Sequence, residues 1–176
     1  MDELSLVTPT MEYAGAIMDF RREMLDAGSS FDGCNCLGSY ARAEDWLAHV
    51  EEARSEELMA AKHKVASDLW LAVRKSDGRI VGIIDFRHSL DHPVLAQWGG
   101  HIGYCVRPSE RRKGYAKEML RLDLEYCKAY GLDRVMVSCH KGNLGSEKTI
   151  LANGGVFEKE VKVDGETVRR FWIELN

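Results

Sequence analysis

The chain lacks the features that would assign it to several specialised classes of protein. No apolar run in its 176 residues approaches the roughly 20 needed to span a bilayer, and its start lacks the basic and apolar regions of a signal peptide. A formal net charge of -4 leaves no basic excess, which argues against a nucleic-acid partner. We therefore expect a cytoplasmic protein with no nucleic-acid partner and no membrane association.

The cysteines of the chain show no metal-binding spacing. The five cysteines are odd in number and include no CxxC pair, so neither a disulfide framework nor a thiolate zinc site is predicted. We expect buried, reduced thiols at these positions: Cys34, Cys36, Cys105, Cys127 and Cys139.

What is present fits one globular domain over residues 1–176. Hydrophobic residues make up 45% of the chain and charged residues 30%, and the length allows a single core of ordinary size. Alternating and helical apolar spacings, with tight-turn signals at Asp77-Gly78 and Asp164-Gly165, give the order strand, two helices, three strands, helix, strand, helix, two strands. The expected strands are 4–7, 69–73, 80–84, 100–106, 134–139, 156–163 and 167–175; the expected helices are 9–27, 43–62, 114–131 and 143–151, with loops at 28–38 and 89–97. The fold class is therefore mixed α/β.

The segment 102–116, with the sequence IGYCVRPSERRKGYA, is the most informative part of the chain. A strand ends before Pro108, and a helix begins near Gly114. The first amide groups of a helix have no internal partner and lie at the positive end of its dipole, so they favour an anion. Gly114 has no side chain to obstruct a phosphate, and Ala116 keeps the first turn thin. A basic, solvated helix start is the alternative interpretation.

The signatures of other phosphate-binding loops are missing from this segment. A Walker loop needs GxxxxGK[ST] and a dinucleotide fold needs GxGxxG, and neither occurs here. The anion is therefore not ATP or NAD by these signatures.

VRPSERRKGYA resembles motif A of the GNAT superfamily of N-acetyltransferases, whose core [RQ]xxGx[GA] directly follows a strand. Here it is Arg111-x-x-Gly114-x-Ala116. The element order is similar over almost the whole chain, and the segment from Asn143 to Phe157 is similar to the family's second segment on the cofactor side. The resemblance implies a mixed, mostly antiparallel sheet flanked by helices, with two splayed strands forming an acyl-coenzyme A cleft.

The resemblance also implies a site for acetyl-coenzyme A, the expected acyl donor. The pantetheine arm would lie beside the backbone of Tyr104 to Val106, and Asn143 and Ser146 would approach the arm and the thioester. Helix capping is the alternative role for these last two residues. The expected donor-binding residues are Tyr104, Cys105, Val106, Arg111, Arg112, Lys113, Gly114, Tyr115, Ala116, Asn143 and Ser146, and no metal is expected.

The reaction implied is direct attack of a primary amine on the thioester. A lysine-like amine of pKa ~10.4 costs about 4.6 kcal/mol to deprotonate at pH 7, so a base is useful. His101 matches the position at which many relatives carry a glutamate base, although a histidine satisfied within the sheet is an equal alternative. Asp85, an acid among apolar neighbours, is the second candidate, with a structural salt bridge as its alternative role.

Several alternatives remain open at this stage. The family often places a tyrosine in the last helix as the acid, where this chain has Leu151, so a non-catalytic acyl-coenzyme A sensor or interaction module is a second hypothesis. Cys139, approached by His101, is a rival covalent nucleophile. His88 with His92, or Cys34 with Cys36, could be an incomplete metal site. The acceptor, a small molecule or a peptide amine, is not identified, and a homodimer is not excluded.

Overall fold

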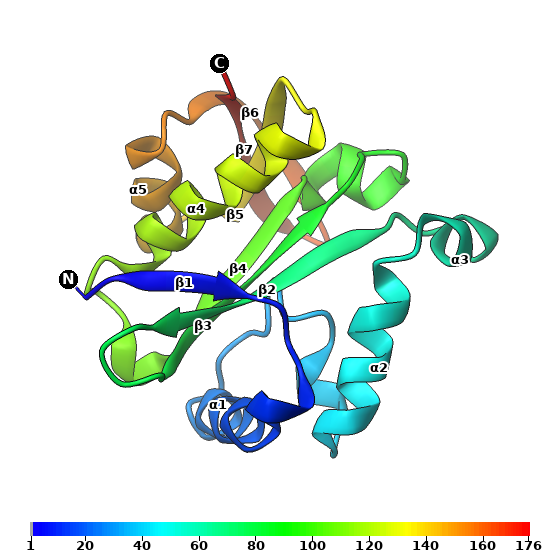
Figure 1. Cartoon of the computed structure of the whole chain (residues 1–176). Helices are drawn as coiled ribbons and strands as arrows, with labels where there is room; N and C mark the ends of the chain where they lie inside the picture. Colours follow the sequence, from blue (N-terminus) through cyan, green and yellow to red (C-terminus); the bar gives the residue numbers. More distant parts are fainter. Residues whose placement is uncertain (1) are drawn as a thin grey trace.

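The computed structural model describes residues 2–176, which form one seven-stranded sheet with helices on both faces (Figure 1). The strand order is β1-β2-β3-β4-β5-β7-β6. The strands are β1 (Leu4–Val7), β2 (Ser67–Arg74), β3 (Ile80–Arg87), β4 (Ile102–Val106), β5 (Arg134–His140), β6 (Val156–Val163) and β7 (Glu166–Glu174). The helices are α1 (Ala14–Asp26), α2 (Ala43–Ala53), α3 (Glu56–Ala61), α4 (Tyr115–Tyr130) and α5 (Leu144–Ala152).

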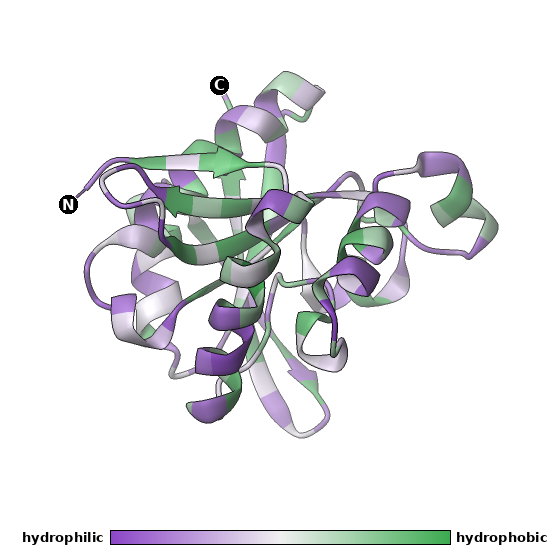
Figure 2. Ribbon diagram, turned by 60° about the horizontal axis from the view of Figure 1, so that its bottom comes forward, coloured by the Kyte–Doolittle hydropathy of each residue, from purple (hydrophilic) through white to green (hydrophobic). Residues whose placement is uncertain are grey.

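The sheet separates two hydrophobic cores. Helices α4 and α5 cover one face and α1 and α2 the other, as Figure 1 shows. Met119 and Leu120 of α4 are fully buried in the first core, and Phe20 and Trp46 are fully buried in the second. Figure 2 shows strands that are mainly hydrophobic and helices in which hydrophobic and hydrophilic residues alternate, the pattern of a helix that buries one side. No helix within residues 2–176 has the length and apolar character needed to span a bilayer.

Strand pairing is antiparallel everywhere except between β4 and β5, which confirms the predicted mixed, mostly antiparallel sheet. The parallel pair is held by a single register position, Ile102 opposite Val137. Beyond that position β4 continues to pair with β3, from Ile102 to Val106, while β5 pairs with β7. The two middle strands therefore diverge, and each keeps its other neighbour.

Among the boundaries that differ from those expected from the sequence, three change the start or the number of elements. The first helix does not begin at Pro9, because a short 3-10 turn over Met11–Tyr13 precedes α1. The expected helix 43–62 is two helices, since the hydroxyl of Ser55 accepts the amide hydrogen of Leu58 and starts α3. The expected loop 89–97 runs into a π-helical turn over Leu95–Gly99, which delays the start of β4 to Ile102.

Candidate active site

A groove of about 1490 Å³ follows the divergence of β4 and β5 and continues over the face that carries α1 and α2. Its lining includes Gly103 to Val106 of β4 on one side and Ser138, Cys139 and His140 of β5 on the other. A pocket for one small ligand measures roughly 300–1,000 Å³, so this groove has room for two reactants. After the acyl donor and the acceptor expected from the sequence, we call the part beside β5, α4 and α5 the donor half, and the part beneath α2, α3 and residues 28–38 the acceptor half.

The turn before α4 has the geometry of an anion site. Gly114, the residue before the helix, has a φ of 88°, a left-handed conformation that favours glycine. The backbone amides of residues 112 to 116 donate to no acceptor within residues 2–176, and the turn lines the groove. These free amides lie at the positive end of the α4 dipole, which favours binding of an anion such as a phosphate group.

The three basic side chains of the turn have different surroundings. The exposed Arg111 side chain is held by protein partners: Nε donates to the Val106 carbonyl at 3.0 Å and Nη2 donates to the Ser29 hydroxyl at 2.9 Å. Lys113 Nζ pairs with the carboxylate of Glu110 at 2.9 Å. Arg112 is exposed, and its side chain makes no hydrogen bond or ion pair within residues 2–176. Arg112 is thus the side chain of this turn whose charge is free for an anion.

A buried carboxylate holds the turn in place. Glu110 is 5% exposed and accepts from Arg74 at 2.9 Å as well as from Lys113. Burial alone would raise the pKa of Glu110, but these two cations hold it below its usual value. Arg74 also donates to the hydroxyl of Tyr115, the first residue of α4. The start of α4 is therefore fastened to β2 through charged side chains.

The hydroxyls of Tyr104 and Ser146 connect β4 with the first turn of α5. They lie 2.7 Å apart, and both residues line the donor half. Burial raises the pKa of Tyr104 well above its ordinary value, against the opposing effect of its bond to Ser146. Asn143 caps α5, since its side-chain oxygen accepts from the amide of Ser146 at 3.2 Å.

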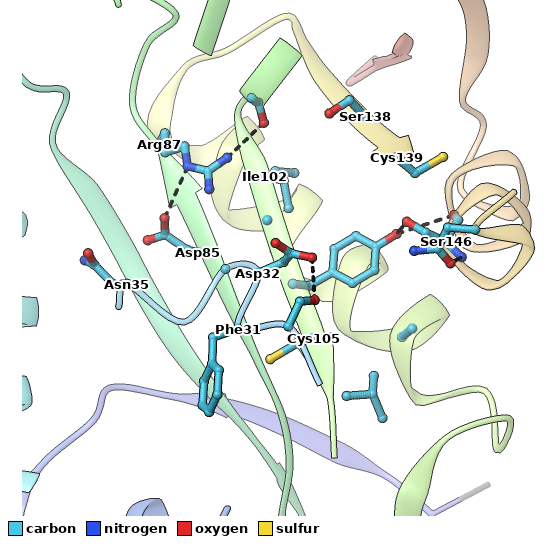
Figure 3. A pocket seen from close by; sticks show the side chains of 18 of the residues that line it. Phe31, Asp32, Asn35, Asp85, Arg87, Ile102, Cys105, Ser138, Cys139 and Ser146 are labelled. Atoms are coloured by element: carbon cyan, nitrogen blue, oxygen red, sulfur yellow. Dashed lines mark hydrogen bonds and ion pairs between the residues drawn. The ribbon is translucent and has the colours of Figure 1, made fainter. Parts of the chain in front are cut away.

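Asp85 and Arg87 project from β3 into the acceptor half (Figure 3). Asp85 is 5% exposed; its Oδ2 lies 3.4 Å from Arg87 Nε, and its Oδ1 is buried without a hydrogen-bond partner. Burial raises the pKa of Asp85, and the Arg87 charge only partly opposes this. Asp85 lies opposite Gly103 in the β3–β4 ladder, so its unsatisfied carboxylate is beside the divergence of β4 and β5.

Residues 28–38 form one wall of the acceptor half and supply Asp32 and Asn35 to it. The wall is firmly placed, because Trp46 Nε1 donates to the Cys34 carbonyl at 3.0 Å and Nε2 of His49 is 2.9 Å from the side-chain oxygen of Asn35. In Figure 3, Asp85 and Arg87 lie on one side of the view and Cys139 and Ser146 on the other.

His101 lies at the closed end of the divergence and is not among the residues that line the groove. Its Nδ1 accepts the amide hydrogen of Met136 at 2.9 Å, and its own amide donates to the Met136 carbonyl at 2.8 Å. Burial and the charge of Arg87 lower the pKa of His101 to about 4. The imidazole is therefore neutral at pH 7 with its proton on Nε2, and it joins β4 to β5 where they part.

The cysteine and metal alternatives find little geometric support. Burial raises the pKa of Cys139 to about 11, so its thiol is protonated at neutral pH. His88 is held between Glu56 and Asp68, and among residues 2–176 no three potential ligands are grouped as a metal ion requires.

Sequence reasoning missed three features of the groove. Arg87 had a usable signal, since residues two apart on a strand share a face and Asp85 was already singled out. The sequence signal for the side chain of Tyr104 is weaker, because the resemblance assigns a role only to the backbone of this residue. Asp32 had none, since a loop residue reaches β4 only through packing distant in the sequence.

A family model described as "Acetyltransferase (GNAT) domain" matches residues 34–156. The chain is 31% identical over 84 residues to the uncharacterized N-acetyltransferase YjdG of Bacillus subtilis (strain 168). That match covers 47% of this chain and 48% of the relative, so it spans about half of the relative's length.

Solved structures give a likeness over nearly the whole chain. RimJ of Mycobacterium smegmatis, in complex with CoA-disulfide, has a TM-score of 0.71 at 21% identity, covering 97% of this chain and 81% of that one. The microcin C7 self-immunity acetyltransferase MccE, in complex with acetyl-CoA and AMP, has a TM-score of 0.67 at 17% identity, covering 99% and 93%. At these identities the likeness concerns the fold, and the predicted fold class is confirmed by it.

Proposed function

This chain belongs to the GNAT family of acetyltransferases, and we propose that it transfers the acetyl group of acetyl-coenzyme A to a primary amine within a ternary complex. The observation that carries the proposal is the run of free backbone amides over residues 112 to 116, which faces the same groove as the divergence of β4 and β5. The structures of MccE and RimJ, similar in fold, contain acetyl-CoA and CoA-disulfide respectively.

In the donor half, the chain's own groups match a doubly phosphorylated carrier with a long arm. The amides of residues 112 to 116 and the side chain of Arg112 would hold the pyrophosphate. The β5-facing edge of β4, from Tyr104 to Val106, would bind the amides of the pantetheine arm as a neighbouring strand would. Lys113 and Arg111 act differently in this proposal: both stabilise the turn through protein contacts and are not primary phosphate ligands.

In the acceptor half, we assign Asp85 as the group that accepts the proton of the attacking amine. Asp85 lines the groove, and its Oδ1 is buried without a hydrogen-bond partner, so this oxygen can accept a hydrogen bond from an ammonium group that enters the acceptor half. The pKa raised by burial makes it a stronger base than an exposed carboxylate. His101 is less suited, since its Nδ1 already accepts a backbone hydrogen.

The donor is a thioester, whose acyl group passes to the amine as its thiolate leaves. The thiol of the leaving group has a pKa of roughly 8.5, so only modest assistance is required. We assign this assistance to the Tyr104 hydroxyl, which is protonated at neutral pH and hydrogen-bonded to Ser146. This pair takes the place of the tyrosine expected at Leu151, which is 49% exposed. Cys139 is not needed as a nucleophile, because its thiol is protonated at neutral pH.

The test is release of free thiol from acetyl-coenzyme A across a panel of primary amines, including amino acids, small amines and peptides with free N-termini. Turnover with at least one amine, accompanied by an acceptor mass gain of one acetyl group, supports the proposal. Tight donor binding with no transfer to any amine would instead support a non-catalytic acyl-coenzyme A sensor. Absence of donor binding would remove both.

A further inference from the structure

Two buried thiols from distant parts of the chain meet at the acceptor half of the groove. Cys34 belongs to the wall formed by residues 28–38, and Cys105 belongs to β4, 71 positions later. Their Sγ atoms lie 2.8 Å apart, and both cysteines are free. Neither residue was predicted from the sequence to contact the other.

The contact is enforced by packing on both sides. Gly33 has a φ of 68°, and a Cβ placed there would lie 2.1 Å from the carbonyl oxygen of Gly103, so the wall lies directly against the β4 backbone. From behind, Trp46 Nε1 donates to the Cys34 carbonyl at 3.0 Å. The backbone around Cys34 is therefore held by β4 at Gly33 and by Trp46 at the Cys34 carbonyl, which keeps the two sulfur atoms close together.

We infer that Cys34 and Cys105 form a reversible disulfide when the protein meets a peroxide, fastening residues 28–38 to β4. Cys105 lines the groove and is the thiol that a small oxidant reaches first. Its sulfur attacks one peroxide oxygen, the O–O bond breaks, and a sulfenic acid and one water are formed. The Cys34 sulfur then attacks the sulfenic sulfur, the S–OH bond breaks, and the disulfide and a second water result.

The geometry makes Cys34 the second thiol to react. It is fully buried, and burial raises its pKa, so it is a poor target for an oxidant in solution. A reactive thiol usually needs a high fraction of thiolate. Cys34 can react without it, because its sulfur already contacts the sulfur of Cys105. A disulfide has an S–S distance of roughly 2.05 Å, so closing the bond requires a shift of less than about 1 Å.

The consequence concerns the groove, because the fastened wall carries Asp32 and Asn35. The bond would covalently join the acceptor wall to the strand whose other edge faces the donor half. This inference does not depend on the proposed acetyl transfer, and its test needs no turnover measurement.

The experiment treats the full chain with hydrogen peroxide and maps the disulfides by non-reducing peptide mass spectrometry. We expect the loss of two hydrogen atoms from the intact mass, one linked peptide pair containing Cys34 and Cys105, and full reversal by dithiothreitol. The oxidised protein should melt about 5–10 °C higher, since the link closes a long loop in the unfolded chain.

Cys36 provides a matched control, because it lies in the same wall but is exposed. Cys36→Ser should keep both the linked peptide and the rise in melting temperature, while Cys34→Ser should lose both. Differential alkylation of the wild-type chain before and after peroxide gives a second measurement that does not depend on the fold of any variant. Cysteines 34 and 105 remaining alkylatable after oxidation, or an equal mass loss in Cys34→Ser, would overturn the inference.

Discussion

The hydroxyl of Tyr104 lies 2.7 Å from the hydroxyl of Ser146, so a side chain of β4 contacts the first turn of α5 across the divergence of β4 and β5. No local pattern predicts this contact, since 42 positions separate the two residues. It places a protonated phenol, with a pKa above its ordinary value, inside the donor half of the groove.

If this phenol assists the leaving thiolate, Tyr104→Phe should lower kcat by about 10- to 100-fold, below or at the lower limit of the usual range for acid catalysis, because the thiolate needs little assistance. Affinity for coenzyme A should change by no more than about twofold, because the phenyl ring is retained. Steady-state kinetics with calorimetric donor binding would measure both. Tyr126→Phe is the matched control, since Tyr126 stacks on Trp70 away from the groove and its change should leave kcat unaltered. Equal kcat values for the two variants would exclude the assignment.

Gly114 and Gly131 allow the phosphate turn to be tested against helix stability. They flank α4 with φ values of 88° and 109°, so a valine should cost similar backbone strain at either, about 1–2 kcal/mol of unfolding free energy. Only Gly114→Val adds a side chain at the free amides of the groove, and it should weaken coenzyme A binding by at least about 10-fold. Calorimetry on both folded variants decides the matter. Comparable donor affinity in the two would place the pyrophosphate elsewhere.

The contrast between the turn and the acceptor half shows what the sequence can specify. The segment around Gly114 was interpretable because its function lies in consecutive backbone amides, so the local residue order nearly determines the geometry. The position of Asp32 depends on the packing of Gly33 against Gly103, between segments 70 positions apart. His101 shows a third case: its residue type suggested a base, but the bond from Met136 that occupies Nδ1 exists only in the assembled sheet.

The helix boundaries illustrate the same limit on a smaller scale. Apolar spacing alone continued the second helix through Ser55, because helical periodicity on both sides of this residue is compatible with one element. The hydroxyl of Ser55 instead caps α3, so that a second helix begins there. Serine is a common helix N-cap, so the local sequence does contain a signal for this boundary.

Asp85→Asn tests the proposed base while preserving the shape of the site. We expect kcat/KM to fall by about 10²-fold or more and to lose the acidic limb of its pH profile, which in the wild type should lie above the pKa of an ordinary carboxylate. Stability should move in the opposite direction. Burial raises the pKa of Asp85 in the folded state, so the folded chain holds this proton more tightly than the unfolded chain does. The free energy of unfolding of the wild type should therefore fall as pH rises from the unfolded pKa of Asp85 through its folded pKa. Unfolding by urea should therefore show Asp85→Asn at least as stable as wild type at pH 7.

The matched variant for Asp85 is Asp32→Asn, on the opposite wall of the acceptor half. If the effect of Asp85 arises from proton acceptance, Asp32→Asn should raise the acceptor KM and keep the acidic limb of the pH profile. If the acidic limb of the pH profile were lost in Asp32→Asn but kept in Asp85→Asn, Asp32 and not Asp85 would be the residue that accepts the proton.

His101 and His88 should affect stability with opposite pH dependence. The folded pKa of His101 is about 4, below the ordinary value of about 6.5, so its contribution is present above pH 6.5 and is lost as pH falls toward 4. For His88, burial alone would lower the pKa, but hydrogen bonds to Asp68 and Glu56 raise it above 6.5. Its contribution is therefore complete below pH 6.5 and is lost as pH rises through the folded pKa.

Urea unfolding of His101→Gln and His88→Gln between pH 5 and 8 measures these contributions as differences from wild type. The two carboxylates beside His88 have further partners, since Arg54 donates to Asp68 and Tyr130 donates to Glu56, so the comparison must be made variant by variant. The deficit of His101→Gln should grow with pH, and that of His88→Gln should shrink. If the His101 deficit instead shrank with rising pH, its imidazole would be charged in the fold and Nδ1 could not accept from Met136. Kinetics on the same proteins should show an unchanged pH profile of kcat for His101→Gln above pH 5, because in this structure the histidine joins two strands and does not receive the proton.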